Sequence, residues 1–271
     1  MSRDDINCHY VSESLTRLWE GKGHELHFYD FSTKEIECLP SKKLFARRGL
    51  NTPTVERWLS DVIEAPLGRF RKVLRKRIGP VPAEVDDLAA HRALLLLLPL
   101  QVARMAEVKW GPGQLDQICK WTPQKLDRIV GTIRSTYSLI IVQGHPRLPF
   151  YFTEHGFFML PFPGASIEHA AATAMPLNEW EAVVALPRSM NRDVVSRTLT
   201  QGEGAYINNC SVGTNANRVV IHPGVIDAMD EVLLIAEIEA ARSRTRDCYR
   251  TSLQAMNVIS DAIARVGDRI T

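Results

Sequence analysis

The chain has 271 residues, of which 45% are hydrophobic and 24% are charged. This is the composition of a folded globular protein, and it argues against extended disorder. The net charge of +2 excludes a polycation, so any nucleic-acid surface has to be a local patch.

Five scattered cysteines, none of them in a C-x-x-C pair, argue against a disulfide framework and against a cysteine zinc site. Free thiols favour a reducing compartment, and we expect a cytoplasmic protein. The opening residues MSRDDINCHY lack the apolar segment of a signal peptide. The longest apolar run, 93–100, is much shorter than the roughly 20 residues that cross a bilayer, so we expect no membrane partner.

In the first part of the chain, apolar residues flank a turn-forming stretch at 30–34 and predict strands near 25–30 and 35–39. Thr52-Pro53 is typical of a helix start. Apolar residues at three- and four-residue spacing continue from there and predict a helix that Pro66 kinks or splits.

Two further helices are expected, at about 83–109 and within 112–136, the second interrupted at 121–123 with Thr122 as the N-cap. Beyond them, helices are expected at 191–206 and from 224 to the end. β-branched and apolar runs predict strands at 137–142, 149–153, 157–160, 181–186 and 218–222.

Strands and helices that are segregated along the chain predict an α+β fold, with the middle and C-terminal helices packed on mainly antiparallel strands. We expect a single domain over 1–271, with possible sub-units at 1–136 and 137–271. The sequence contains no Walker loop, dinucleotide fingerprint, nucleophile elbow or H-E-x-x-H helix. It therefore assigns no metal site and leaves any cofactor unknown.

Short motifs over residues 8–222 resemble, in the same order, those of a bacterial family known as domain of unknown function 4238. The similar segments are Cys8-His9-Tyr10-Val11, the strand pair LHFYDFSTKEIE, Glu64 within a helix, Gln101-Val102-Ala103-Arg104, Phe152-Thr153-Glu154-His155, Met175-Pro176-Leu177, Asn208 and Ala216-Asn217-Arg218-Val219.

Two positions depart from the family pattern: Ser12 stands where the family has proline, and Glu154-His155 replaces a Ser-Asp pair. If that pair does acid–base or metal work in relatives, the chemistry is changed or lost in this chain. The resemblance also implies a place in bacterial defence.

His9 is a candidate catalytic residue, as a general acid/base or a phosphate donor, or else a structural histidine. Glu154 and His155 follow a predicted strand, where a carboxylate and an imidazole are often catalytic. The alternative for this pair is a solvated turn, because Gly156 follows at once.

Gln101 and Arg104 lie three residues apart on an apolar helix and are candidate substrate-binding residues. A buried arginine requires a partner. That partner is an anionic ligand or, equally, an internal salt bridge to a residue such as Glu64. Asn208 is a further candidate for substrate binding, or else a turn former.

A basic stretch is the most conspicuous charge feature and suits a phosphate backbone, although it also suits a solvated face. Lys42, Lys43, Arg47 and Arg48 add a second basic cluster. The predicted nucleic-acid-binding residues of the stretch are Arg69, Arg71, Lys72, Arg75, Lys76 and Arg77.

These features leave two hypotheses. One is an enzyme with nuclease-like phosphodiester chemistry, in which His9, Glu154 and His155 transfer protons. The other is a non-catalytic binding or regulatory protein whose basic helix engages a nucleic acid or a protein partner. Under either, the C-terminal helix at 225–268 packs on the core or forms a homodimer.

Overall fold

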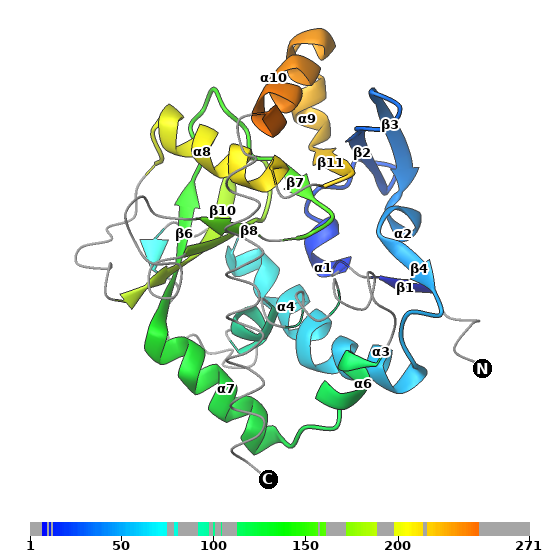
Figure 1. The fold of residues 1–271 in the computed structure, drawn as a ribbon, viewed down its shortest axis with the longest axis vertical. Helices are drawn as coiled ribbons and strands as arrows, with labels where there is room; N and C mark the ends of the chain where they lie inside the picture. The colour runs from blue at the N-terminus through cyan, green and yellow to red at the C-terminus, as the bar shows by residue number, and fades with distance from the viewer. Residues whose placement is uncertain are drawn as a thin grey trace.

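The computed structural model describes residues 7–9, 11, 13–74, 79–80, 92–97, 100, 104, 113–156, 158–160, 172–188, 198–213 and 216–243. The described strands pair in antiparallel sheets, and several helices lie before, between and after them in the chain. The predicted α+β class is confirmed (Figure 1).

A four-stranded antiparallel sheet contains the predicted hairpin. Its strand order is β3 (Glu35–Pro40), β2 (Glu25–Asp30), β11 (Arg218–Ile221) and β7 (Phe152–Thr153). In this register Asp30 lies opposite both Glu35 and Arg218, and Val219 lies opposite Thr153. The C-terminal ends of β2 and β7 therefore share one end of the sheet with the start of β11.

A five-stranded antiparallel sheet forms the second β unit. It has the order β5 (Gly79–Pro80), β6 (Tyr137–Gln143), β10 (Glu181–Pro187), β9 (Ala172–Pro176) and β8 (Phe158–Leu160). Strands β6, β10 and β8 lie where apolar runs predicted them. Strand β7 is shorter than the predicted 149–153, because Asn208 takes the hydrogen-bonding groups at Pro149 and Tyr151.

The N-terminal region wraps around one end of the hairpin. Strand β1 (Asn7–His9) pairs with β4 (Ala46–Arg48), and α2 (Ser41–Leu44) joins β3 to β4. Helix α1 (Glu13–Thr16) contacts both α2 and α4 (Ala65–Leu74). In Figure 1 this short helix lies between them, near the middle of the molecule.

The helix that starts at Thr52 runs without a break into α4, but it contains a π-helical segment. Helix α3 (Pro53–Leu59) continues into η2 (Ser60–Glu64), where the Ala65 N–H bonds back to the Ser60 carbonyl. Pro66 has no N–H and cannot bond to the carbonyl four residues earlier. The predicted disturbance at Pro66 thus takes the form of a π turn directly before it.

Two helices follow in the middle of the chain, α6 (Gln114–Ile118) and α7 (Pro123–Thr136). The Thr122 side chain accepts a hydrogen bond from the Lys125 N–H, as its predicted N-cap role requires. Residues 92–97, Leu100 and Arg104 are helical. The rest of the helix predicted at 83–109 lies outside the described residues.

Three helices close the described chain: α8 (Gln201–Val212), α9 (Pro223–Ile226) and α10 (Glu231–Ser243). Of the helix predicted at 191–206, residues 191–197 lie outside the described residues, 198–200 are not helical, and 201–206 are helical. Helix α8 begins after Thr200, whose side chain forms a capping box with Glu203. The homodimer surface predicted along 225–268 lies beyond residue 243 for most of its length, outside the described residues.

Two groups of buried side chains form the core. The larger group joins the helical middle to the five-stranded sheet and reaches Phe28 and Phe152 of the four-stranded sheet. The smaller group holds α10 on the outer face of β2 and β11, through Tyr29, Ile221 and Ile238. Within the described ranges, no helix is long and apolar enough to cross a bilayer.

Candidate functional site

His9 ends strand β1 and is fixed by a hydrogen bond to the main chain of α2. Its Nε2 lies 3.3 Å from the Lys42 carbonyl oxygen, and its Nδ1 lies 4.0 Å from a Glu13 carboxylate oxygen. A carbonyl can only accept, so Nε2 carries the proton in this contact. Nδ1 of the neutral ring then keeps its lone pair and faces Glu13.

Glu64 is the last residue of the π turn and is tied to the start of α1. Its Oε2 accepts the Ser14 N–H at 3.0 Å, and its carbonyl accepts the Ser14 hydroxyl at 3.1 Å. The π turn and α1 therefore position the Glu64 carboxylate together. Such turns within helices are frequent at functional sites.

Arg104 is one of the most buried charged residues of the described chain, with 3% of its side chain exposed. Its Nη2 lies 3.7 Å from Glu64 Oε1, which is too long for a hydrogen bond. Within the described part of the chain, its Nε has no hydrogen-bond partner. The structure thus contains the ion pair with Glu64 that was one of the two expected alternatives, but the pair leaves donors of Arg104 unused.

These residues belong to two ion-paired groups, His9–Glu13–Arg17 and Glu64–Arg104, which helix α1 links through Ser14. We call them together the α1 cluster. Arg17 completes it by pairing with Glu13 at 2.7 Å, and about half of its side chain is exposed. The members of the α1 cluster are His9, Glu13, Arg17, Glu64 and Arg104. It unites two predicted site residues, His9 and Arg104, with the helical glutamate of the family resemblance.

Glu154 lies in a second polar group, directly after β7. The turn requires Gly156, which has a φ of 72°. The buried Oε1 of Glu154 accepts both the backbone N–H and the side-chain Nδ2 of Asn217, at 2.9 and 3.0 Å. Burial raises the pKa of Glu154, and the hydrogen bond from the Asn217 backbone opposes that shift.

Asp30 and Arg218 pair across neighbouring strands beside Glu154. Arg218 Nε donates to Asp30 Oδ2 at 2.9 Å, and the Ser32 backbone N–H donates to Oδ1 at 2.8 Å. Burial acts to raise the pKa of Asp30, but the hydrogen bonds from Ser32 and Arg218 outweigh it and lower the pKa to about 2. We call Asp30, Glu154, Asn217 and Arg218 the sheet-end cluster.

The two clusters lie toward opposite ends of the four-stranded sheet. Strand β3 starts at Glu35, opposite Asp30, and ends at Pro40, just before the α2 turn that holds His9. Six residues of strand span roughly 17 Å, at about 3.3 Å per residue. The structure therefore does not bring His9 together with Glu154 and His155. His155 follows Glu154 in the turn and is half-buried.

Asn208 is buried in α8 and bonds to the backbone that leads into β7. Its Nδ2 donates to the Pro149 carbonyl at 2.7 Å, and its Oδ1 accepts the Tyr151 N–H at 3.2 Å. Both ends of the amide are thus occupied inside the protein. This geometry accounts for Asn208 without a substrate.

Among the predicted nucleic-acid-binding residues, Arg69 is exposed on α4, and Arg71 and Lys72 belong to the same helix. Gln101, Arg75, Lys76 and Arg77 lie outside the described residues. The second basic cluster is described in full, and all its members are exposed: Lys42, Lys43, Arg47 and Arg48.

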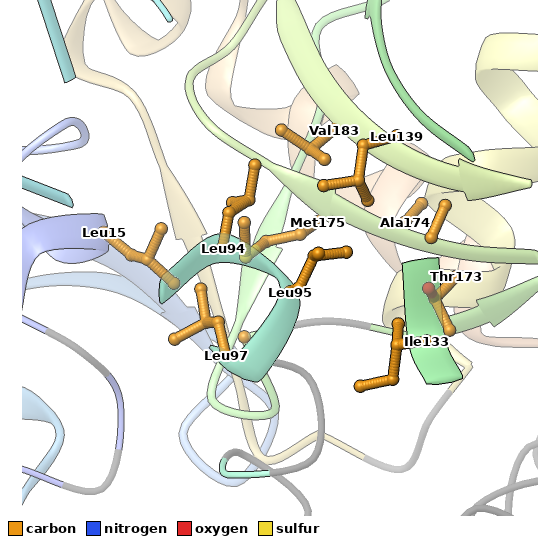
Figure 2. A pocket seen from close by; sticks show the side chains of 12 residues that line it. Leu15, Leu94, Leu95, Leu97, Ile133, Leu139, Thr173, Ala174, Met175 and Val183 are labelled. Atoms are coloured by element: carbon orange, nitrogen blue, oxygen red, sulfur yellow. The ribbon is translucent and has the colours of Figure 1, made fainter. Parts of the chain in front are cut away.

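A cavity of about 40 Å³ lies between α1, helical residues 92–97 and the five-stranded sheet. Figure 2 shows Leu94, Leu95 and Leu97 facing the strand residues Met175 and Val183 across it. Thr173 supplies the only side-chain oxygen among the described lining residues. The described lining includes no member of either cluster, although Leu15 of α1 adjoins Ser14.

The sequence did not single out Glu13, Arg17, Asp30 or Arg218 as site residues. Asp30 and Arg218 are 188 positions apart, and only the pairing of β2 with β11 brings them together. The available signal was their presence in motifs of the family resemblance, YD and Ala-x-Arg. Within the described ranges, no group of three or more histidine, cysteine or acidic side chains is placed to hold a metal.

The chain was also compared with protein-family models, curated proteins and solved structures. No family model, no curated protein and no solved structure matches it. Membership of the domain of unknown function 4238 family therefore stays a prediction from the motifs.

Proposed function

We propose that this protein binds nucleic acid through the segment formed by α2 and β4. The observation that carries the proposal is the exposure of all four cations of that segment: Lys42, Lys43, Arg47 and Arg48. Clustered exposed lysines and arginines are the electrostatic footprint of a phosphate-backbone surface.

The surroundings of this segment support the same proposal. Strand β4 pairs with β1, so Arg47 lies opposite Cys8 and next to His9. Helix α1 contacts both α2 and α4, and α4 carries exposed Arg69. A strand of nucleic acid that follows these cations would pass beside the α1 cluster. A cytoplasmic location belongs to the proposal, because the described cysteines are free thiols.

The test is binding of fluorescently labelled RNA and DNA over a series of salt concentrations. If all four cations contact phosphates, the slope of log K against log salt is about −3.6 for duplex DNA. Reversing the charge of two exposed residues, Lys43→Glu with Arg48→Glu, is expected to weaken binding at least tenfold and to flatten the slope by about 2.

The matched control reverses two exposed charges on α7, Arg128→Glu with Arg134→Glu. This variant has the same net charge as the first but leaves α2 and β4 intact. Equal loss of binding in both variants would show a response to net charge alone and would contradict the proposal, as would absence of binding by the wild-type protein.

A second candidate function, phosphodiester hydrolysis at the α1 cluster, is favoured by the geometry of His9. The bond to the Lys42 carbonyl leaves the lone pair of Nδ1 available as a general base. Arg17, about half exposed, is placed to bind a phosphate that approaches from solvent.

Incubation of pure protein with labelled RNA and DNA, with and without magnesium or manganese, tests this function. We expect any cleavage to disappear in His9→Ala and to persist in Glu154→Gln. Cleavage that depends on Glu154 and not on His9 would assign the chemistry to the sheet-end cluster instead. Salt-sensitive binding without turnover would leave the protein as a non-catalytic binder.

A further inference from the structure

Arg104 is an anomaly among the charged residues of the structure. A guanidinium carries five N–H donors. Among the residues that the structure describes, the one polar contact of Arg104 is the 3.7 Å approach to Glu64, and its Nε has no hydrogen-bond partner. A buried charge without hydrogen bonds is costly, and the packing of a hydrophobic residue would usually be more stable. Such a group in a folded protein calls for a functional explanation.

The hydrogen-bonding groups of Arg104 and Glu64 define which ligand could bind between them. Arg104 offers donors and needs an acceptor oxygen, whereas Glu64 offers acceptor oxygens and needs a donor. Glu64 Oε2 is already occupied by the Ser14 N–H, which leaves Oε1 as the oxygen nearest to Arg104. A ligand that bridges the two must present an acceptor and a donor close together.

We propose that Arg104 and Glu64 form a binding site for a protonated phosphate group, that is, inorganic phosphate or a terminal phosphate monoester. Inorganic phosphate keeps at least one O–H at neutral pH, which can donate to Glu64 while its anionic oxygens face Arg104. A terminal monoester has a second pKa of about 6, so only about a tenth of it keeps that proton at pH 7, and it binds in this protonated form. A phosphodiester and a sulfate carry no such proton, so the Glu64 carboxylate repels them. Arginine suits this task because its fork matches the geometry of phosphate.

Access to the pair is from the side of Glu64, whose side chain is 23% exposed while that of Arg104 is 3% exposed. Arg17 is near the pair: its pKa is raised chiefly by the hydrogen bond to Glu13, and the charge of Glu64 adds to that shift. A site of this depth suits a chain end or a small phosphorylated molecule better than the middle of a polymer. The proposal does not depend on binding of nucleic acid by α2 and β4.

The first experiment is calorimetric titration of the full-length protein at pH 7 with sodium phosphate and, separately, with sodium sulfate. Phosphate is expected to bind at least tenfold more tightly than sulfate. Adenosine monophosphate, a 5′-phosphorylated oligonucleotide and its 5′-hydroxyl counterpart then distinguish free phosphate from a terminal monoester. Equal affinity for phosphate and sulfate, or no phosphate binding up to 10 mM (roughly the 3 kcal/mol level), would overturn the proposal.

Two variants test whether phosphate binds at Arg104 and Glu64. Glu64→Gln is expected to weaken phosphate binding and to strengthen sulfate binding, so that the preference falls at least fivefold. Arg104→Lys keeps the charge but loses the fork, and phosphate binding should weaken at least tenfold. Arg128→Met on α7 is the control and should leave both affinities unchanged.

Glu64→Gln carries the test by itself if the arginine variant fails to fold, because the amide keeps the shape of the carboxylate. An unchanged preference for phosphate over sulfate in this variant would refute the role of Glu64. RNA and DNA binding should be lost in the α2–β4 charge reversal and kept in Glu64→Gln. That result would separate this site from the polymer-binding surface.

Discussion

The Arg104–Glu64 pair of the α1 cluster and the sheet-end cluster both contain an arginine and a carboxylate, but only the sheet-end groups are held by short hydrogen bonds. At the sheet end, Arg218 and Asp30 meet at 2.9 Å, and Asn217 makes two bonds to Glu154 at 2.9 and 3.0 Å. In the α1 cluster, the Arg104–Glu64 contact is 3.7 Å long. The more deeply buried arginine is therefore the one with fewer bonds.

This difference separates structural polar residues from candidate binding residues. Short, charge-assisted hydrogen bonds at the sheet end join strands that are distant in sequence. They outweigh the effect of burial on the pKa of Asp30 and oppose it in part for Glu154. The long contact between Arg104 and Glu64 leaves that pair with donors and an acceptor that a ligand can use. We infer that the sheet-end cluster stabilises the fold and that the α1 cluster binds.

The largest expected effect on stability concerns Asn208, which we assign a structural role. Asn208→Ala would leave the Pro149 carbonyl and the Tyr151 N–H unsatisfied in the interior. We expect a loss of about 3 kcal/mol in the free energy of unfolding, measured with urea. Asn209→Ala, the neighbouring residue of α8, is the control and should cost much less.

The pH dependence of stability tests the two carboxyls of the sheet-end cluster. The folded-state pKa of Asp30 is about 2, below its ordinary value of 3.8, so its contribution is present above pH 4 and is lost as the pH falls toward 2. Asp30→Asn should therefore cost about 2 kcal/mol at pH 7 and almost nothing at pH 2.

Glu154 should behave in the opposite way. Burial raises its pKa above the ordinary value of 4.5, so its contribution is present below pH 4.5 and is lost as the pH rises through the folded-state pKa. Glu154→Gln is expected to be more stable than wild type at pH 7 and equal to it at pH 4. A variant less stable than wild type at pH 7 would show that the ionised carboxylate is needed there.

The smallest expected effect concerns the cavity beside α1. Ala185 of β10 lines this space of about 40 Å³, and valine would fill part of it with a residue that suits strands. Ala185→Val should raise the melting temperature slightly, by a gain of at most about 1 kcal/mol in stability. A clear loss would mean that the lining is already tightly packed.

Local patterns predicted much of the fold. The hairpin β2–β3 and the buried strand β10 follow from apolar runs and turn residues, and Thr122 caps α7 as expected. Strand β9 was missed because Ala172–Pro176 is rich in small residues that carry no strand signal. The start of α8 was misplaced although the T-x-x-E pattern at 200–203 marks it.

The candidate site was less predictable, because it depends on contacts between distant segments. A salt bridge from Arg104 to Glu64 was one of two open alternatives. Residue types alone could not predict that the two groups would be too far apart for a hydrogen bond. The link of His9 to Glu64 through α1 needed the contacts of Glu13 and Ser14. The separation of His9 from Glu154 followed only from the strand register.

The most direct test of this account compares the unfolding free energies of Arg218→Met and Arg104→Met in phosphate-free buffer and again with phosphate. We predict that Arg218→Met lowers the free energy of unfolding by about 2 kcal/mol, because it leaves the buried carboxylate of Asp30 without its arginine partner. Arg104→Met should cost less than about 1 kcal/mol and should lose the stabilisation that phosphate gives the wild-type protein. A larger cost for Arg104→Met than for Arg218→Met, with the response to phosphate retained, would contradict the assignment of the α1 cluster to binding.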